Sequence, residues 1–176
     1  MGYWNTRGLR GEGLEDQINI TNELYREKGL ALVQKIPTPI KPIRIDSEKR
    51  VITLGYFEQK STVDYIGAVQ GVPICFDAKE TTKAFLPMSN IHAHQVAFMR
   101  EFKEQGGLAF LIVYFKKYET YHLLPIEQLE PLYKAGLTGG RKSIPYATFE
   151  KAYPIHIEGG MYIHYLKALQ AYMASI

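Results

Sequence analysis

Apolar positions recur along this chain at two spacings, one typical of helices and one typical of strands. A helical period predicts helices over residues 14–28, 89–105 and 161–173. Alternating or continuous apolar runs predict strands over residues 30–35, 43–45, 51–57, 61–67, 72–79, 108–115 and 118–124. The order helix, strands, helix, strands, helix predicts an α/β fold, in which helices pack on the faces of a mixed sheet.

Three local features add detail to this outline. Ser89 is the expected N-cap of the second helix, and Gly106 with Gly107 is its expected end. Residues 108–115 are almost continuously apolar, which predicts a central strand buried on both faces. The polar turn 46–50 joins two strands of a basic segment that we expect to project from the core as an arm.

Composition is typical of one soluble globular domain. The chain has 176 residues, of which 46% are hydrophobic and 22% charged, so we expect a single domain over residues 1–176. No apolar run approaches the roughly 20 residues that cross a bilayer, and residues 1–10 lack the apolar centre of a signal peptide. The one cysteine, Cys75, excludes an intrachain disulfide, so we expect a cytoplasmic protein with no membrane contact.

Positive charge is concentrated in a few segments. The net charge is only +3, but residues 34–60 contain six basic and three acidic residues and so carry +3 by themselves. The candidate DNA-binding residues are Arg10, Lys35, Lys41, Arg44, Lys49, Arg50, Lys60, Arg141 and Lys142. Each basic patch has two interpretations, solvated surface charge or contact with nucleic-acid phosphates.

The candidate chemistry lies on a hairpin whose second strand covers residues 72–79. Side chains alternate along a strand, so Asp77 and Lys79 share a face with Cys75. A turn after the first strand is expected to place Asp64 opposite Cys75, with Asp77 as its diagonal neighbour within about 7 Å. Two carboxylates and an ammonium group are therefore expected on one patch.

Such a patch suits phosphodiester hydrolysis. Two neighbouring carboxylates repel each other unless a cation lies between them, and oxygen ligands favour Mg²⁺, with Mn²⁺ as a substitute. The ion polarises the phosphate and lowers the pKa of a bound water, while Lys79 offsets the charge of the transition state. The alternative is a surface salt bridge on an edge strand, but unpaired charge in these mostly apolar strands is costly.

Several other polar residues have open interpretations. Gln95 falls on the apolar face of the second helix, four residues after Ile91, either as a satisfied core amide or as part of the active site. Glu15, at the start of the first helix, either complements the helix dipole or supplies a third carboxylate. His92 and His94 are two apart on the predicted helix, so we expect them to diverge and to make a poor metal pair.

Short motifs in order and spacing resemble the RecU family, the Holliday junction resolvases of Gram-positive bacteria. They are Arg10-Gly11, Leu14-Glu15-Asp16, Ile18-Asn19, Thr21-Asn22, Pro37-Thr38-Pro39, Lys60-Ser61-Thr62, Asp64-Tyr65, Phe76-Asp77-Ala78-Lys79-Glu80-Thr81, Asn90, His92, His94-Gln95, Gly107, Gly140-Arg141-Lys142-Ser143-Ile144 and Ala152-Tyr153-Pro154-Ile155. The resemblance covers nearly the whole chain from about Arg10. Two positions depart from the family pattern: Leu9 replaces an Asn, and Asp77 stands where Glu is common.

The resemblance implies a restriction-endonuclease-like fold of the PD-(D/E)xK superfamily, acting as a homodimer that nicks two opposed strands of a four-way junction. The implied Mg²⁺ ligands are Thr62, Asp64, Asp77 and Gln95. Lys79 would stabilise the transition state, and Glu15 would complete the site. The hairpin 39–57 resembles the family's stalk, which enters the junction centre. RecA and the RuvAB branch-migration machinery are the implied partners.

We therefore expect a Mg²⁺-dependent endonuclease that resolves Holliday junctions during recombination and repair. One alternative is a nuclease of the same fold that acts on linear duplex, but the projecting arm favours a branched substrate because a flat duplex offers no opening for it. The other alternative is a non-cutting protein that binds branched DNA and modulates a recombinase. The acids Asp64 and Asp77, together with Lys79, favour an enzyme, since a silent protein does not need them.

Overall fold

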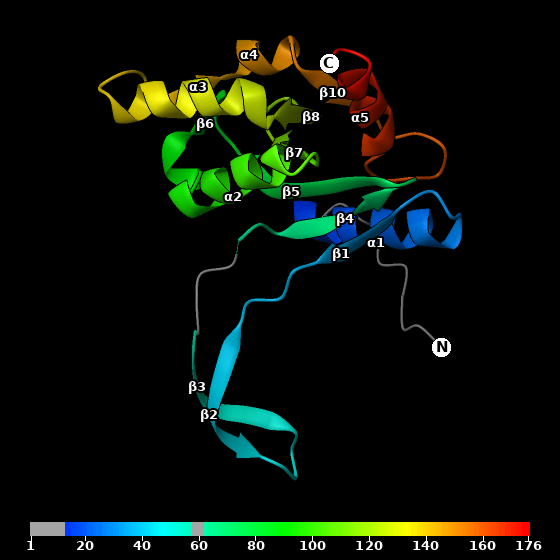
Figure 1. Cartoon of the computed structure of the whole chain (residues 1–176), viewed down its shortest axis with the longest axis vertical. Coiled ribbons are helices and arrows are strands. Elements are labelled where there is room, and N and C mark those ends of the chain that lie inside the picture. Colours follow the sequence, from blue (N-terminus) through cyan, green and yellow to red (C-terminus); the bar gives the residue numbers. More distant parts are fainter. Residues whose placement is uncertain (1–12, 58–61) are drawn as a thin grey trace.

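The core of the molecule is a mixed six-stranded sheet in the order β1-β4-β5-β7-β8-β10 (Figure 1). The computed structural model describes residues 13–57 and 62–176. The strands of the sheet are β1 Leu32–Lys35, β4 Tyr65–Val69, β5 Val72–Thr81, β7 Leu108–Phe115, β8 Thr120–Pro125 and β10 Tyr153–Ile155. Strands β5 and β7 pair in parallel, and every other neighbouring pair is antiparallel.

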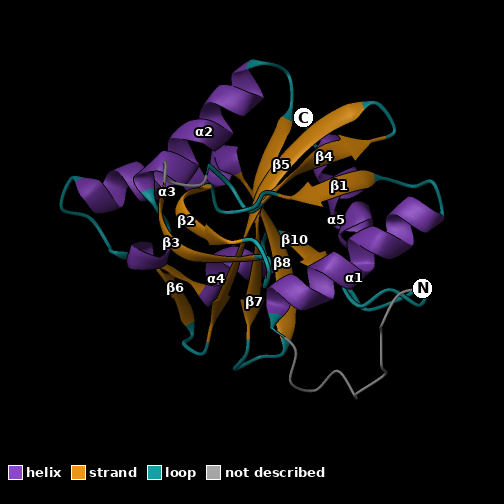
Figure 2. Ribbon diagram, turned by 90° about the horizontal axis from the view of Figure 1, so that it is seen from below, coloured by secondary structure: helices purple, strands orange, loops and turns teal. Residues whose placement is uncertain are grey.

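Helices cover both faces of this sheet, as Figure 2 shows in a view from below. Helices α1 Leu14–Glu27 and α5 Tyr165–Met173 pack on one face, and α2 Ala93–Glu104, α3 Ile126–Leu137 and α4 Tyr146–Glu150 pack on the other. Side chains of β5 alternate between the two cores, so Ile74 and Phe76 join the first and Cys75 joins the second. The expected α/β architecture of a mixed sheet flanked by helices is confirmed.

Strand β7 is the centre of the sheet. Every residue of β7 except Tyr114 is buried, because helices cover both of its faces and β5 and β8 flank both of its edges. The prediction of a central, doubly covered strand is therefore confirmed.

No helix among the described residues is long and apolar enough to span a membrane.

The basic arm is a separate two-stranded sheet that projects from the core (Figure 1). Strands β2 Ile40–Asp46 and β3 Val51–Phe57 pair in antiparallel fashion, with irregular register around Arg44. Almost all of their side chains are exposed, including large apolar ones such as Ile43 and Phe57. The projecting hairpin is confirmed, and β2 begins three residues earlier than the sequence pattern predicts.

Two helices begin later than predicted. Residues Met88–Asn90 form a short 3₁₀ helix, η1, and the backbone of His92 is extended, so α2 begins at Ala93 and the prediction of Ser89 as its N-cap was wrong. Residues 158–161 form a small bridged turn in which Gly159 and Gly160 have positive φ, and this turn delays α5 to Tyr165. Helix α3 was not predicted, and it contains Pro131.

A second small sheet lies beside the ends of the central strands. Strand β6 Phe85–Pro87 pairs in antiparallel fashion with β9 Ser143–Pro145. This pairing holds the loop that carries Arg141 and Lys142 next to η1, because the Met88 N–H donates a hydrogen bond to the Lys142 carbonyl oxygen at 3.1 Å. The two-stranded sheet thus links the chain before α2 to the chain before α4.

Gly67 permits the close approach of β4 to the edge strand β1. A Cβ atom there would lie 2.2 Å from the Leu32 carbonyl oxygen and 2.6 Å from the Val33 Cα, so backbone atoms would have to move. We predict that Gly67→Ala lowers the free energy of unfolding by about 1–3 kcal/mol in urea titrations. Gly13→Ala is the control, because a Cβ at Gly13 meets nothing within 4 Å. Equal midpoints for the two variants would contradict this prediction.

Candidate active site

Asp77 is a fully buried carboxylate in the middle of β5. Its Oδ1 accepts hydrogen bonds from the Asp64 N–H at 3.0 Å and from the Gln95 side-chain amide at 2.9 Å. Its Oδ2 forms an ion pair with the Lys79 ammonium group, whose side chain is 13% exposed. A backbone donor, an amide donor and a cation therefore surround this buried charge, as a carboxylate in an apolar core requires.

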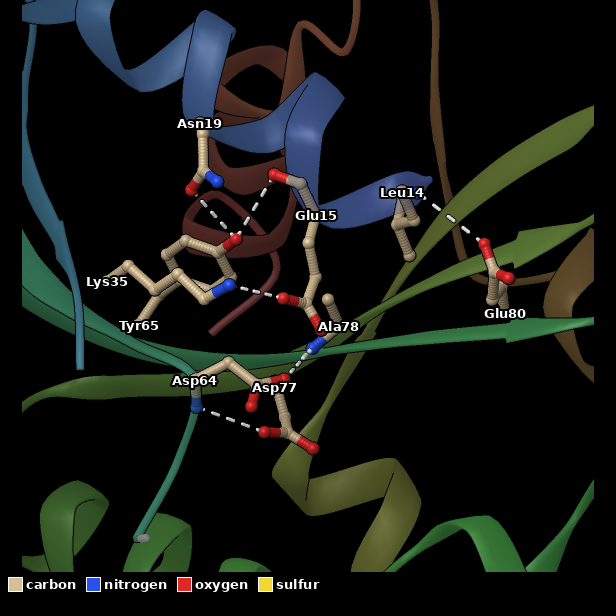
Figure 3. Close-up of polar contacts among 9 residues, drawn as sticks. All are labelled: Leu14, Glu15, Asn19, Lys35, Asp64, Tyr65, Asp77, Ala78 and Glu80. Carbon is tan, nitrogen blue, oxygen red and sulfur yellow. Dashed lines mark hydrogen bonds and ion pairs between the residues drawn. The ribbon is translucent and has the colours of Figure 1, made fainter. Parts of the chain in front are cut away.

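Asp64 lies directly across the hairpin from Asp77 (Figure 3). Its Oδ2 accepts a hydrogen bond from the Ala78 N–H at 2.9 Å, so each aspartate binds the backbone of the opposite segment. Asp64 comes immediately before β4, where the regular pairing of Tyr65 with Phe76 ends. The two side chains therefore occupy the place where the next rung of backbone hydrogen bonds would form.

The predicted register of this hairpin was wrong by two residues. Asp64 was expected opposite Cys75, but the structure pairs Cys75 with Ile66. The reason is the turn: Val69 still pairs with Val72, and only Gln70 and Gly71 form the loop, both with positive φ. A two-residue loop of this kind fixes the register. The correction brings the two carboxylates closer than the predicted diagonal arrangement.

The shared environment of the two aspartates raises the pKa of Asp77 to about 7. Burial is the largest cause, because it disfavours the charged form, and the neighbouring Asp64 carboxyl acts in the same direction. Lys79 opposes these effects but does not cancel them. The site therefore favours additional positive charge between its two acids.

Gln95 connects α2 to this pair. The residue is buried, its amide nitrogen donates to Asp77, and its Oε1 accepts a hydrogen bond from the His92 N–H at 3.3 Å. Gln95 therefore contacts the pair of aspartates, and its part in the active site stays a prediction. In this arrangement Gln95 fixes the orientation of the Asp77 carboxylate.

Glu15 reaches toward the site from the first turn of α1 (Figure 3), but its carboxylate is paired with a cation. The Lys35 ammonium group donates to Glu15 Oε2 at 2.5 Å, and this bond raises the pKa of Lys35. The Tyr65 hydroxyl anchors the same turn, with contacts of 3.3 Å to the Glu15 carbonyl oxygen and 3.0 Å to Asn19 Oδ1. Sequence reasoning missed this Tyr65 anchor and assigned Lys35 to DNA binding alone.

The acids do not gather into a larger cluster. Among residues 13–57 and 62–176, no group of three or more His, Cys, Asp and Glu side chains is arranged to hold a metal ion. The structure brings together Asp64, Asp77, Lys79 and Gln95. Thr62 is half-buried in the segment that leads into Asp64.

Apart from Lys35, which pairs with Glu15, the predicted DNA-binding residues fall into three groups. Those on the hairpin are exposed: Lys41, Arg44, Lys49 and Arg50. Arg141 and Lys142 are also exposed, in the loop before β9. Arg10 and Lys60 lie outside the described residues.

Two other sequence-based interpretations have clear outcomes. His92 and His94 do not diverge, because their rings stack with centroids 5.5 Å apart and an interplanar angle of 6°. That expectation assumed a helix that already includes His92, whereas α2 begins at Ala93. Cys75 lies on the predicted face of β5, packed in the second core, where burial raises the pKa of its thiol to about 12.

The raised pKa of Asp77 predicts how stability changes with pH in metal-free buffer. Below its ordinary pKa of 3.8 the carboxyl is protonated in both states, whereas between 3.8 and about 7 only the folded state retains the proton. The free energy of unfolding of the wild type should therefore fall relative to Asp77→Asn as pH rises from 4 to 7, by on the order of 3 kcal/mol. Urea titrations of both proteins in EDTA measure this difference, and parallel pH profiles would contradict it.

Comparisons with known proteins identify the family of this chain. The solved structure of Hjc from Archaeoglobus fulgidus, a Holliday junction resolvase from an archaeal hyperthermophile, matches 80% of this chain and 93% of its own with a TM-score of 0.48 and 13% identity. Three proteins named Holliday junction resolvase RecU are more similar in sequence. That of Geobacillus kaustophilus is 44% identical over 146 residues, which are 81% of this chain and 73% of its own.

The other two come from lactic acid bacteria. The protein of Pediococcus pentosaceus is 40% identical over 167 residues, covering 92% of this chain and 83% of its own, and that of Limosilactobacillus reuteri is 39% identical over 171 residues, covering 94% and 84%. The family model described as RecU, Recombination protein U, matches residues 9–171. This chain belongs to the RecU family.

Proposed function

We propose that this protein is a Holliday junction resolvase, a metal-dependent endonuclease that makes paired nicks in four-way DNA junctions during recombination and repair. One observation carries the proposal: Asp64 and Asp77 face each other across a hairpin, with Lys79 beside them, in a chain of the RecU family. Relatives named Holliday junction resolvase RecU support this assignment.

The donor set fits a hard divalent cation, and we take Mg²⁺ as the natural one with Mn²⁺ as a substitute. Asp64 and Asp77 offer carboxylate oxygens, and Thr62 and Gln95 are the remaining proposed ligands. The raised pKa of Asp77 supports this fit, because two crowded carboxylates gain most from a cation between them. When bound, the ion would polarise the scissile phosphate and lower the pKa of an attacking water.

The chain's own groups have distinct tasks in this proposal. Lys79 supplies an ammonium group beside the aspartates, where it offsets negative charge that develops on the phosphate. Gln95 and the Asp64 N–H hold the Asp77 carboxylate in one orientation. Glu15 is the proposed third carboxylate, and Lys35 of β1 holds it by an ion pair. Pre-oriented groups of this kind lower the cost of reaching the transition state.

The projecting hairpin and the proposed homodimer both match the shape of a four-way junction. The hairpin β2–β3 carries four exposed cations and projects from the core, as an element that enters the centre of a junction would. A junction has two-fold symmetry, so we propose a homodimer that aligns one active site with each of two strands. RecA and the RuvAB machinery are proposed partners, and the cytoplasm is the proposed compartment.

A nuclease that acts on linear duplex is the alternative function within the same chemistry. A duplex-cutting enzyme has no use for an exposed apolar and basic hairpin that extends away from the active site. A silent DNA-binding protein is the other alternative. The buried Asp77–Lys79 pair argues against it, because a buried charge costs stability that a non-cutting protein has no reason to sacrifice.

Cleavage of a labelled synthetic four-way junction tests the proposal directly. We predict symmetrical nicks with Mg²⁺ and none in EDTA, and we predict that Asp77→Ala lowers the cleavage rate by about a thousandfold while junction affinity stays within a factor of about two. Asp77→Asn repeats the test with little change of shape, and Glu104→Gln on the exposed end of α2 is the matched acid-to-amide control. Undiminished cutting by both Asp77 variants would remove this residue from the mechanism.

Removal of the hairpin tests its role in substrate choice. Ile40 pairs with Phe57, so a two-glycine link in place of residues 43–56 closes a short loop beyond this pair without disturbing β1 or β4. We predict that the preference for junction over linear duplex falls by about tenfold or more in gel-shift competition at fixed salt, because the element that fits the junction opening is lost.

A charge variant separates shape from electrostatics in the same assay. Arg44→Gln with Arg50→Gln keeps the hairpin but should weaken junction and duplex binding to a similar extent, since these cations attract the phosphates of any DNA. An unaltered preference in the deletion variant would exclude the hairpin from junction recognition.

A further inference from the structure

A polar pocket lies at the far end of the strand that carries Asp77 and Lys79. Its volume is about 250 Å³, and its walls include Glu80, Thr81, Thr82, Lys83, Asn90 and Lys116. Thr81 lies two residues after Lys79 on β5 and therefore on the same face, and a strand rises about 3.3 Å per residue. The pocket therefore begins within about 10 Å of Lys79, whose ammonium group is proposed to lie beside the scissile phosphate.

Hydrogen bonds fix the turn that forms one wall of this pocket. The Thr81 hydroxyl donates to the Phe85 carbonyl oxygen at 3.2 Å and accepts from the Lys83 N–H at 3.1 Å. On the other side, the Lys116 N–H donates to the Thr81 carbonyl oxygen at 2.9 Å. Buried Thr81 therefore fixes the shape of this wall, and the side chains of Thr82 and Lys83 are exposed on it.

Positive charge lines the rim of the pocket and continues beyond it. Lys116 pairs with Glu80 at 2.6 Å, and the Lys83 ammonium group lies 5.4 Å from the centre of the Phe85 ring. The opposite wall is η1, to which the β6–β9 pairing attaches the basic loop with Arg141 and Lys142. A DNA strand that leaves the catalytic lysine along β5 would meet cations on both sides of the pocket.

The size and chemistry of the pocket suit one nucleobase. Pockets for drug-sized ligands have volumes of roughly 300–1,000 Å³, so a cavity slightly below this range accepts a smaller group. The Asn90 amide offers both donors and an acceptor, and the Thr82 hydroxyl offers one donor with acceptor capacity. Asparagine amides of this kind read base edges, and threonine hydroxyls can bond to several bases.

We propose that this pocket binds a nucleotide that flanks the scissile phosphate, and that Asn90 and Thr82 make the cleavage rate depend on its base. Lys83 contacts the adjoining phosphate in this arrangement and adds affinity without sequence information. The inference rests on the proposed function, because the position of the scissile phosphate follows from Asp77 and Lys79. It assigns specificity to the end of β5, apart from the hairpin that recognises the shape of the junction.

Single-turnover cleavage of a panel of junctions tests this proposal. The junctions differ only in the two nucleotides on each side of the cleaved bond, and the assay contains Mg²⁺ at fixed salt. We expect wild-type rates to spread over about tenfold or more, and Asn90→Ala to reduce the spread to about threefold or less. Thr82→Val removes an exposed hydroxyl without loss of volume, so it provides a second variant that leaves the core untouched.

Two further variants separate a loss of base recognition from a general loss of stability or of DNA affinity. Gln170→Ala, an amide truncation on the exposed side of α5, should keep the full wild-type spread. Lys83→Ala should lower junction affinity equally for every sequence and leave the ratio of rates unchanged.

The outcomes separate this inference from the function on which it rests. Equal wild-type rates across the panel, or an undiminished spread in both Asn90→Ala and Thr82→Val, would overturn the pocket's role and leave the resolvase assignment intact. Failure of the wild type to cut any junction with Mg²⁺ would overturn both.

Discussion

The molecule is organised around two carboxylates that face each other where a hairpin opens. Asp64 and Asp77 each accept a hydrogen bond from the backbone of the opposite segment, so the pair replaces a rung of the sheet. Burial of Asp77 and the nearness of the Asp64 carboxyl are energetic costs that Lys79, Gln95 and the backbone N–H groups offset only in part, since the pKa of Asp77 remains raised. This unrelieved negative charge is the physical reason for assigning a divalent cation to the site.

Each neighbour of the pair comes from a different element, which explains the surrounding architecture. Strand β5 is held in parallel to the fully covered β7, so Asp77 and Lys79 have little freedom to move. Helix α2 supplies Gln95 from one face of the sheet, and α1 supplies Glu15 from the other. The hairpin is inserted between β1 and β4, and β3 ends seven residues before Asp64, so the proposed recognition element and the proposed active site are close in the chain.

The sequence predicts the sheet, its central strand, the projecting arm and the meeting of the two acids, because these depend on local periodicity and on alternation. It does not predict their register, because the two-residue loop lies at Gln70 and Gly71 rather than around residues 69 and 70, and this shift of one residue in the turn moves Asp64 by two positions along its partner. It misplaces the start of α2 because Ser89, a favourable N-cap in isolation, belongs to a 3₁₀ turn that the β6–β9 pairing holds in place. The same error led to the prediction that His92 and His94 diverge, whereas their rings stack in the structure.

Local sequence patterns do not predict the contacts between residues that are far apart in the chain. Lys35 was assigned to DNA by its charge, but it ends the strand that pairs with the segment after Asp64, and this position brings it to Glu15. Tyr65 anchors α1 through Asn19, a contact between residues 46 positions apart in the chain. Only the packed fold reveals such pairs, since nothing in the local pattern distinguishes them from ordinary surface and core residues.

The central claim is that Asp64 and Asp77 together hold a divalent ion. Crystals grown with Mn²⁺ and measured at an energy where manganese scatters anomalously test it most directly. The account predicts an anomalous peak between these two carboxylates, with Asp77 Oδ2 turned from Lys79 toward the ion. A protein that cuts junctions with Mn²⁺ and yet shows its anomalous peak away from both aspartates would contradict it.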